Sequence, residues 1–215
     1  MKLRGCSSKV ITSSSNRKVK QIVQWQGKAD RRREAGIFLA EGFKLFGEAP
    51  EENIQEVFLS EDALERAAGD AVLQEKLHRT GYETVSGEVF SKMSDTKTPQ
   101  GILCVIRRPE YTLEQLVNVP SPLLVVLESL QDPGNLGTIF RAGEAAGITG
   151  VIMGGEMADI FHPKTVRATM GSVFRVPFVQ VKCLKEVLEQ LKQMDIRIYA
   201  AHLSGESYYD GFSYK

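Results

Sequence analysis

The 215-residue sequence lacks long apolar segments, and no run approaches the roughly 18 residues that a membrane-spanning helix needs. Its first residues also lack an apolar core segment, so we expect no secretory signal, no membrane association and a cytoplasmic location. The three cysteines, Cys6, Cys104 and Cys183, lie far apart and form no CxxC pair. The three histidines are isolated too, so we expect no metal, and cysteine thiols that are free and either buried or at the surface.

The nucleotide-binding fingerprints GxGxxG and GxxxxGK(S/T) are also missing, which argues against a dinucleotide-dependent or P-loop enzyme. The net charge is zero, but the charges are unevenly distributed. Residues 1–50 hold eleven Lys/Arg and four Asp/Glu, whereas residues 51–90 hold three and ten. A basic segment attracts polyanions such as RNA, although a solvated helical face has the same composition. Arg31, Arg32 and Arg33 are expected to be exposed and to contact RNA.

The first half of the chain alternates between helical and strand patterns, as expected of a small α/β domain. Helices are predicted over residues 15–36, 44–50 and 61–81, and strands over residues 36–42, 54–61, 82–86 and 101–109. The first helix is amphipathic, and three apolar residues mark its buried face: Val19, Ile22 and Val23.

Residues 110–121 are polar and contain proline, and they are predicted to link the first unit to a second one. The second unit is expected to form a doubly wound parallel sheet, in which ligands bind beyond the carboxyl ends of the strands. Its strands are predicted over residues 123–130, 150–155, 178–181 and 196–203, and its helices over residues 136–146, 162–171 and 183–194. The first of these strands is a continuous apolar run, which predicts burial on both faces.

The turn after that strand, "DPGNLGTIFRAGEAAG" (residues 132–147), combines several features of a binding site. Asn135 is expected to cap the helix that follows, and the glycines are expected to let the backbone approach a ligand closely. A helix N-terminus presents free N–H groups, which suit an anion or a ribose edge. Arg141 is long enough to reach back to this end of the helix, or else it is a surface arginine paired with Glu144.

This turn and a second segment, "HPKTVRATMGSVFRVP" (residues 162–177), resemble the first and second motifs of the SpoU (TrmH-type) RNA 2′-O-ribose methyltransferases. Three segments resemble the RNA-binding domain that often precedes them: "ITSSSNRKVKQI", "FLAEGFKLF" and "KMSDTKTPQGILCVIRRP". The resemblance implies an L30e-like α/β domain over residues 1–109, a linker over residues 110–121 and an α/β-knot (SPOUT) parallel-sheet domain over residues 122–215. It also implies S-adenosylmethionine as methyl donor, RNA as substrate (rRNA rather than tRNA) and a homodimer.

The resemblance also assigns roles to residues of both motifs. Asn135 and Arg141 are expected to be catalytic, with Arg141 holding the 2′ oxygen or its phosphate. Arg167 and Arg175 are expected to contact RNA, although Arg175 is equally well interpreted as a structural or dimer-contact residue. Gly171 is expected to allow a tight bend. The edge of the cofactor site is expected to include three residues after the last strand: His202, Leu203 and Ser204.

The third motif of the family has no counterpart before Lys215. We therefore expect the second domain to be incomplete at its C-terminus and its cofactor site to be incomplete as well. Two functions stay open: an RNA 2′-O-ribose methyltransferase, and a non-catalytic RNA-binding fragment or degenerate relative. A nucleotide-dependent α/β enzyme of another class is a third interpretation, and the missing phosphate-loop fingerprints oppose it.

Overall fold

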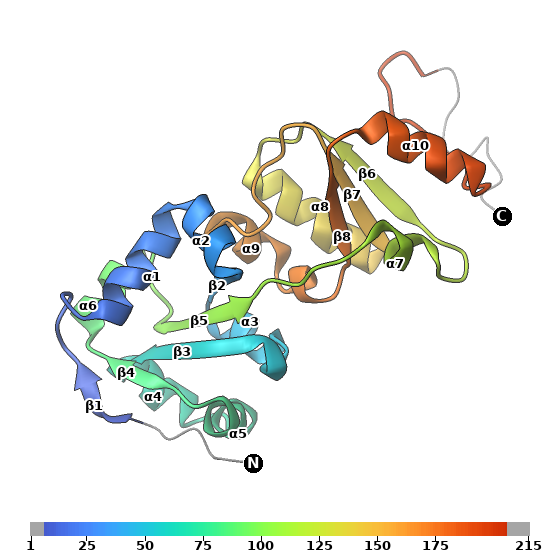
Figure 1. The fold of residues 1–215 in the computed structure, drawn as a ribbon. Helices are drawn as coiled ribbons and strands as arrows, with labels where there is room; N and C mark the ends of the chain where they lie inside the picture. Colours follow the sequence, from blue (N-terminus) through green and yellow to red (C-terminus); the bar gives the residue numbers. More distant parts are fainter. Residues whose placement is uncertain (1–6, 206–215) are drawn as a thin grey trace.

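The computed structural model describes residues 7–205, which form two β-sheets with helices packed around them (Figure 1). The first sheet has the strand order β1-β4-β3-β5-β2. Its strands are β1 Ser7–Ile11, β2 Ile37–Glu41, β3 Ile54–Ser60, β4 Glu83–Val85 and β5 Ile102–Arg107. β4 is parallel to β1 and β3, whereas β5 is antiparallel to β3 and β2. No helix in the described range is long and apolar enough to cross a membrane.

The helices around the first sheet are α1 Arg17–Gly27, α2 Ala29–Ala35, α3 Phe43–Glu48, α4 Glu61–Ala67, α5 Ala71–Thr80 and α6 Gly87–Met93. The single helices predicted over residues 15–36 and 61–81 are each two helices. The first is interrupted at Lys28, whose backbone is extended (φ −129°, ψ 108°). The second is interrupted at Asp70, whose carboxylate accepts from two backbone N–H groups and so starts a new helix.

The buried face of α1 differs by one residue from the prediction. Val19 and Ile22 are buried as expected, but Val23 is 44% exposed. Trp25 is buried in its place. At about 100° per residue, Ile22 and Trp25 lie about 60° and 120° to one side of Val19, whereas Val23 lies about 40° to the other side. Val23 therefore lies at the edge of the buried stripe that Trp25 completes.

One strand and two α-helices of the described range were not predicted from the sequence. β1 is only five residues long and carries two apolar side chains, so its pattern is weak. α6 begins where the Ser86 hydroxyl accepts from the N–H of Val89. α7 Leu113–Val117 lies inside the predicted linker, where Thr112 and Gln115 form a capping box. Because α7 packs on the second sheet, residues 110–121 are not simply a connecting segment.

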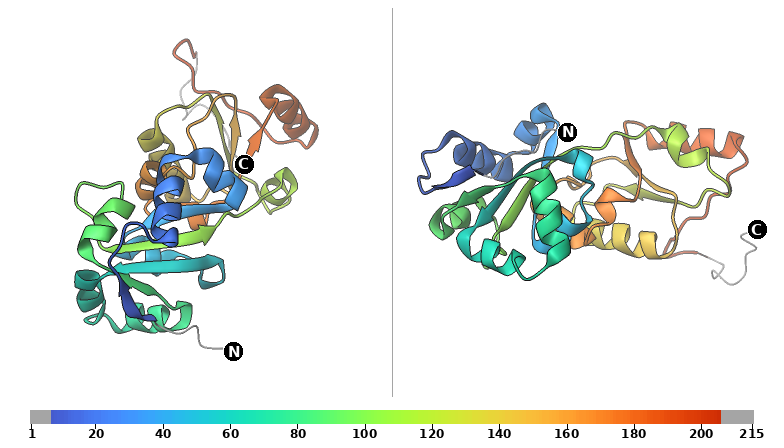
Figure 2. Two further views of the ribbon diagram at one scale, coloured as in Figure 1. Left: turned by 60° about the vertical axis from the view of Figure 1, so that its left-hand side comes forward. Right: turned by 90° about the horizontal axis from the view of Figure 1, so that it is seen from below.

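The second sheet is parallel and consists of β6 Leu124–Glu128, β7 Gly150–Gly154 and β8 Phe178–Val181, in that order. The helices that follow its strands are α8 Pro133–Ala145, α9 Pro163–Thr169 and α10 Leu184–Gln193, with a 3-10 turn, η2, at Ser172–Phe174. Figure 2 shows α8 on one side of this sheet, and α7 and α10 on the other. The α/β fold with a parallel, doubly wound second sheet is thus confirmed.

Two predictions for the second sheet are wrong. β6 is half-buried rather than buried on both faces, because among the described residues only β7 pairs with it and it lies at an edge. Residues 196–203 are apolar enough to predict a strand, but they form no ladder with either edge of the sheet and most of them are exposed. A strand requires a partner for its backbone N–H and C=O groups, and neither β6 nor β8 provides one here.

One continuous apolar cluster joins the two sheets. It contains Phe38 of β2 together with Phe140 of α8 and Phe161, which precedes α9. The rings of Phe38 and Phe161 lie 4.9 Å apart between centroids. The second sheet is therefore packed directly against the first, and the motif-bearing helices α8 and α9 lie beside this contact.

Candidate active site

α8 begins three residues earlier than predicted. Its N-cap is Asp132, whose carboxylate Oδ1 accepts from the backbone N–H of Asn135 at 2.6 Å, and Pro133 occupies the first helical position. The prediction that Asn135 caps the helix is therefore wrong, because an aspartate followed by proline starts the helix first. Asn135 lies in the first turn instead, just beyond the carboxyl end of β6.

Asn135 and Arg141 are both exposed. They are six positions apart in α8, so their side chains leave the helix about 120° apart and about 9 Å apart along its axis. Arg141 forms no hydrogen bond or ion pair with any residue between 7 and 205. Glu144 pairs with Arg175 rather than with Arg141, so the surface ion pair considered for Arg141 is not formed. The guanidinium of Arg141 is thus available to a ligand.

Gly137 faces α9. A Cβ atom at this position would lie 2.5 Å from the Cβ of Ala168 and 2.9 Å from the carbonyl oxygen of Thr165. The close backbone approach predicted for this glycine is therefore made to another helix and not to a ligand.

The second motif forms α9 and the bend after it. The His162 side chain caps α9, with Nδ1 accepting from the N–H of Lys164 at 3.2 Å. The bend begins at Met170 (φ 52°) and continues at Gly171 (φ 104°), which confirms the predicted tight turn. Ser172 is fully buried, and its hydroxyl donates to the carbonyl of Thr169. This motif is therefore a rigid corner next to α8.

Arg32 is buried, which contradicts the expectation that it is an exposed RNA contact. It is 2% exposed, and its Nη1 donates to the carbonyl of Trp25 at 2.6 Å. Its Nη2 pairs with Asp159 Oδ2, also at 2.6 Å. Asp159 lies in the segment between β7 and α9, so the charge of Arg32 is satisfied inside the protein. Arg31 and Arg33 are exposed as predicted.

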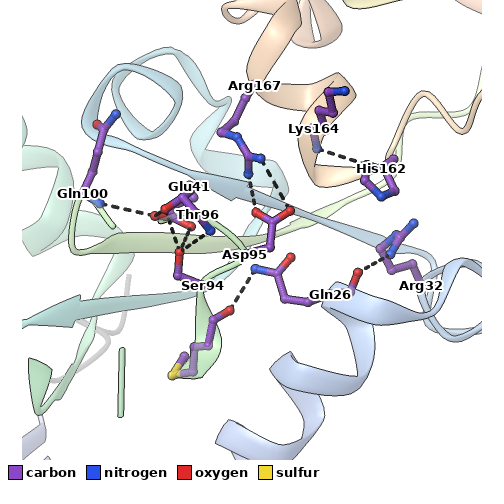
Figure 3. Close-up of polar contacts among 11 residues, drawn as sticks. Gln26, Arg32, Glu41, Ser94, Asp95, Thr96, Gln100, His162, Lys164 and Arg167 are labelled. Carbon is purple, nitrogen blue, oxygen red and sulfur yellow. Dashed lines mark hydrogen bonds and ion pairs between the residues drawn. The ribbon is translucent and has the colours of Figure 1, made fainter. Parts of the chain in front are cut away.

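The two arginines of the second motif form ion pairs with the first sheet's part of the chain. Arg167 Nη1 lies 2.5 Å from Asp95 Oδ1 (Figure 3), and Arg175 Nη1 lies 2.6 Å from Glu48 Oε2. Arg175 also bonds to Glu144 through Nε and Nη2. These hydrogen bonds lower the pKa of Glu144 and raise the pKa of Arg175. RNA contact by Arg167 and Arg175 stays a prediction. Their ion pairs with Asp95 and Glu48 join the second motif to the first unit.

A loop formed by residues 94–100 faces α9 and is organised by Glu41 (Figure 3). Glu41 is 8% exposed and its carboxylate accepts from the Ser94 hydroxyl at 2.7 Å and the Thr96 hydroxyl at 3.1 Å. It also accepts from the backbone N–H of Gln100 at 3.3 Å. Glu41 and Asp95 lie in segments that resemble the family's RNA-binding domain, but the resemblance assigns no role to either residue. Asp159 had no sequence signal at all.

The predicted cofactor residues His202, Leu203 and Ser204 lie in an exposed coil after α10. The N–H of Ser204 donates to Nδ1 of His202 at 3.1 Å, and Leu203 is fully exposed. Among the described residues this trio does not line an enclosed cavity, so its role in cofactor binding stays a prediction.

Two of the three cysteines lie in the described range. Cys104 of β5 is buried, and burial raises the pKa of its thiol to about 12. Cys183 is exposed, and both thiols are free as expected. Cys6 lies outside the described residues.

Two known families match most of the chain. Residues 122–215 match the SpoU rRNA Methylase family, and residues 16–104 match the MRM3-like substrate binding domain. The 23S rRNA (guanosine(2553)-2'-O)-methyltransferase RlmP of Bacillus subtilis is 33% identical over 205 residues, which cover 94% of this chain and 76% of the relative. The mitochondrial rRNA methyltransferase 3 of Homo sapiens is 35% identical over 136 residues, which cover 61% of this chain and 32% of the relative.

Solved structures extend the similarity to the fold. A crystal structure of an rRNA methyltransferase from Sinorhizobium meliloti superimposes with a TM-score of 0.79 at 30% identity, covering 96% of this chain and 78% of that one. An AdoMet-bound rRNA methyltransferase structure from the same organism gives a TM-score of 0.71 at 31% identity, covering 85% and 68%. The similarity therefore spans both sheets, while the predicted domain limits at residues 109 and 122 stay predictions.

Proposed function

Because the chain belongs to the SpoU rRNA Methylase family, we propose that it is an S-adenosylmethionine-dependent methyltransferase acting on a ribose 2′-hydroxyl of ribosomal RNA. The observation that carries this proposal is the 33% identity to an rRNA 2′-O-methyltransferase over 94% of the chain. The match of residues 16–104 to a substrate-binding domain supports RNA as the partner.

S-adenosylmethionine supplies the methyl group when it is bound, and a relative's structure named as AdoMet-bound supports this donor. What this chain supplies is the first motif, with Asn135 and Arg141 exposed on α8 beyond the carboxyl end of β6. Ligands of open α/β sheets bind at that edge.

Arg141 has a defined role in the proposal. A ribose hydroxyl is a weak nucleophile, and negative charge develops on its oxygen as it attacks. Arginine stays protonated in proteins, so it is suited to stabilise that charge and not to remove the proton. Its planar fork can hold the 2′ oxygen and a neighbouring phosphate together. Asn135 orients the ribose through its amide.

Methyl transfer to purified rRNA and tRNA, with a labelled donor, tests the proposal. We expect label in rRNA, and we expect Arg141→Ala to lower the rate about 10²–10³-fold because a charge-stabilising donor is lost. Arg107→Ala, which removes an exposed arginine from the end of β5, is the matched control, and we expect it to keep full activity. Absence of label in rRNA contradicts the proposed function, whereas full activity of the Arg141 variant removes only that residue from the mechanism.

RNA binding without catalysis is not favoured, because the relatives are named as methyltransferases. It predicts retention of rRNA with no label transferred in the same assay. We also propose that the protein is a homodimer in the cytoplasm. Light scattering of the purified chain tests the first point, with twice the mass of one chain expected, and imaging of the tagged protein in its own cells tests the second.

A further inference from the structure

The outward face of α1 carries a row of basic and amide side chains. Arg17, Lys20, Gln21 and Gln24 follow one another at intervals of three, one and three residues. At about 100° per residue they all lie within about 60° of one line along the helix. Together with Ser15 they line a hollow of about 410 Å³. We call these four residues the α1 strip.

The orientation of the α1 strip is fixed by the opposite side of the helix. Val19, Ile22 and Trp25 are buried against the first sheet, so the strip faces outward. A second hollow of about 560 Å³ adjoins the first and shares Lys20 and Gln24 with it. The side chains of the α1 strip therefore border two neighbouring depressions on an ordered surface.

The positive charges of the α1 strip are not neutralised. Arg17 and Lys20 are exposed and form no ion pair with any residue in the described part of the chain. The carboxylates beside α1, those of Glu56 and Glu83, are both bonded to Lys18. These two acids thus have their own cation, and no ion pair within the described residues neutralises Arg17 or Lys20.

Three other exposed cations of the first unit are already paired: Lys92 with Glu88, Arg31 with Glu34 and Arg33 with Asp30. The exposed charges of α2 therefore cancel. Four more exposed cations of the first unit form no ion pair with a described residue, but they lie outside the strip: Lys28, Arg66, Lys97 and Arg107. RNA contact by Arg31 and Arg33 stays a prediction, but the cations of the α1 strip are unpaired whereas those two are not.

We infer that the α1 strip binds the sugar–phosphate backbone of the RNA substrate, an inference that rests on the proposed function. Lysine and arginine neutralise phosphates, and most of the affinity of such surfaces comes from the counterions that this releases. The amide N–H groups of the two glutamines can donate to phosphate oxygens, and their carbonyl oxygens can accept from 2′-hydroxyl groups, a combination that acidic peptides do not offer. Such contacts fix the position of the RNA and carry no base specificity.

The test is the salt dependence of rRNA binding by the full chain, for the wild type and for Arg17→Ala/Lys20→Ala. Each phosphate contact contributes about 0.7–0.9 to the slope of log affinity against log salt between about 50 and 200 mM. We expect the double variant to bind more weakly and its slope to fall by about 1.4–1.8, equally for rRNA fragments of different sequence. Both side chains are exposed, and emission from Trp25 on the buried face verifies that the variant is folded.

Two controls make the result specific. Lys185→Ala/Lys192→Ala removes the same charge from the exposed side of α10, and we expect its slope to stay that of the wild type. Arg31→Ala/Arg33→Ala removes the paired arginines of α2, and we expect a smaller change than for the α1 strip. An unchanged slope for the strip variant, or an equal loss in the α10 control, overturns the inference. Competition by poly-glutamate as effective as that by RNA also overturns it, in favour of an acidic protein partner.

Methyl transfer distinguishes this inference from the proposed function. At saturating rRNA the strip variant is expected to keep the wild-type turnover, since the strip does not touch the reacting atoms. One outcome is that the wild type binds rRNA without transferring a methyl group, while the strip variant shows the expected fall in the slope of log affinity against log salt. In that case the proposed function fails and the inference stands. If the wild type methylates rRNA and the strip variant binds with an unchanged slope, only the inference fails.

Discussion

The helices α8 and α9 pack closely at Gly137 because this residue has no side chain. A methyl group there would come within 2.5 Å of Ala168 Cβ and 2.9 Å of the Thr165 carbonyl. The neighbouring atoms belong to the backbone of α9 and to the Cβ of Ala168, so no change of rotamer can move them away. The first motif thus includes a residue whose role is in packing beside residues proposed for chemistry.

Gly137→Ala is expected to lower the free energy of unfolding by about 1–3 kcal/mol, because the two helices must move apart to admit the methyl group. Urea denaturation measures the loss. Gly27→Ala is the matched control, since a Cβ atom at Gly27 meets nothing within 4 Å. Its effect should be about neutral or a gain of up to about 1 kcal/mol. Equal losses in both variants would contradict a packing role for Gly137.

At the scale of single elements, α9 is tied to the loop of residues 94–100 by the pair between Arg167 and Asp95. Both side chains are 31% exposed, so we expect a coupling free energy on the order of 0.5–1 kcal/mol. Arg167→Asp and Asp95→Arg should each destabilise the protein and weaken rRNA binding. The double exchange should restore both properties, because it recreates the pair with its ends reversed.

A double-mutant cycle, with unfolding and rRNA affinity measured on the same four proteins, separates two roles of Arg167. Recovery of stability with recovery of affinity means that the pair positions α9. Recovery of stability alone means that the guanidinium itself contacts RNA and that docking is not its main role.

Local sequence patterns predicted most helices and strands and failed where the cause was distant. Pro163 marks the first turn of α9 as predicted, and a short apolar run after a glycine predicted β2 correctly. Pro133 marks the first turn of α8, but the sequence pattern did not predict it. Residues 196–203 have the composition of a strand, but a strand depends on a neighbour that no local pattern reveals. The break between α1 and α2 at Lys28 was missed because no proline marks it in the sequence.

The candidate site shows the same division. Asn135 and Arg141 were assigned because both lie in one contiguous motif, and both are exposed, but their catalytic role stays a prediction. Arg32 was assigned wrongly because its partner, Asp159, is 127 residues away in the sequence. Burial of a charge depends on such a partner, which becomes visible only when the two sheets pack together.

For the whole molecule, the shared apolar cluster predicts cooperative unfolding of the two sheets. Phe38 of β2 lies 4.9 Å from Phe161 and 5.9 Å from Phe174 between ring centroids. Phe38→Ala is expected to cost about 3–5 kcal/mol and to lower the stability of both sheets together. Emission of Trp25, the single tryptophan, reports on the first sheet, and hydrogen exchange of the β7 amides reports on the second.

Val72→Ala is the control for this experiment, because Val72 is 75% exposed and its truncation should leave both transitions in place. Two separate transitions in the wild type, or a loss confined to Trp25 emission in the Phe38 variant, would show that the sheets unfold independently.

The fit between Glu48, Gly171 and Arg175 limits how this enzyme could be recombined with its relatives. A Cβ atom at Gly171 would lie 1.7 Å from Glu48 Oε2, and that same oxygen bonds to Arg175. A chimera that takes its RNA-recognition half from another methyltransferase would place a foreign side chain against this corner. The grafted half must therefore keep the acids at positions 48 and 95, because they pair with Arg175 and Arg167 of the recipient. The RNA-recognition half of this protein cannot be exchanged without preserving these two contacts.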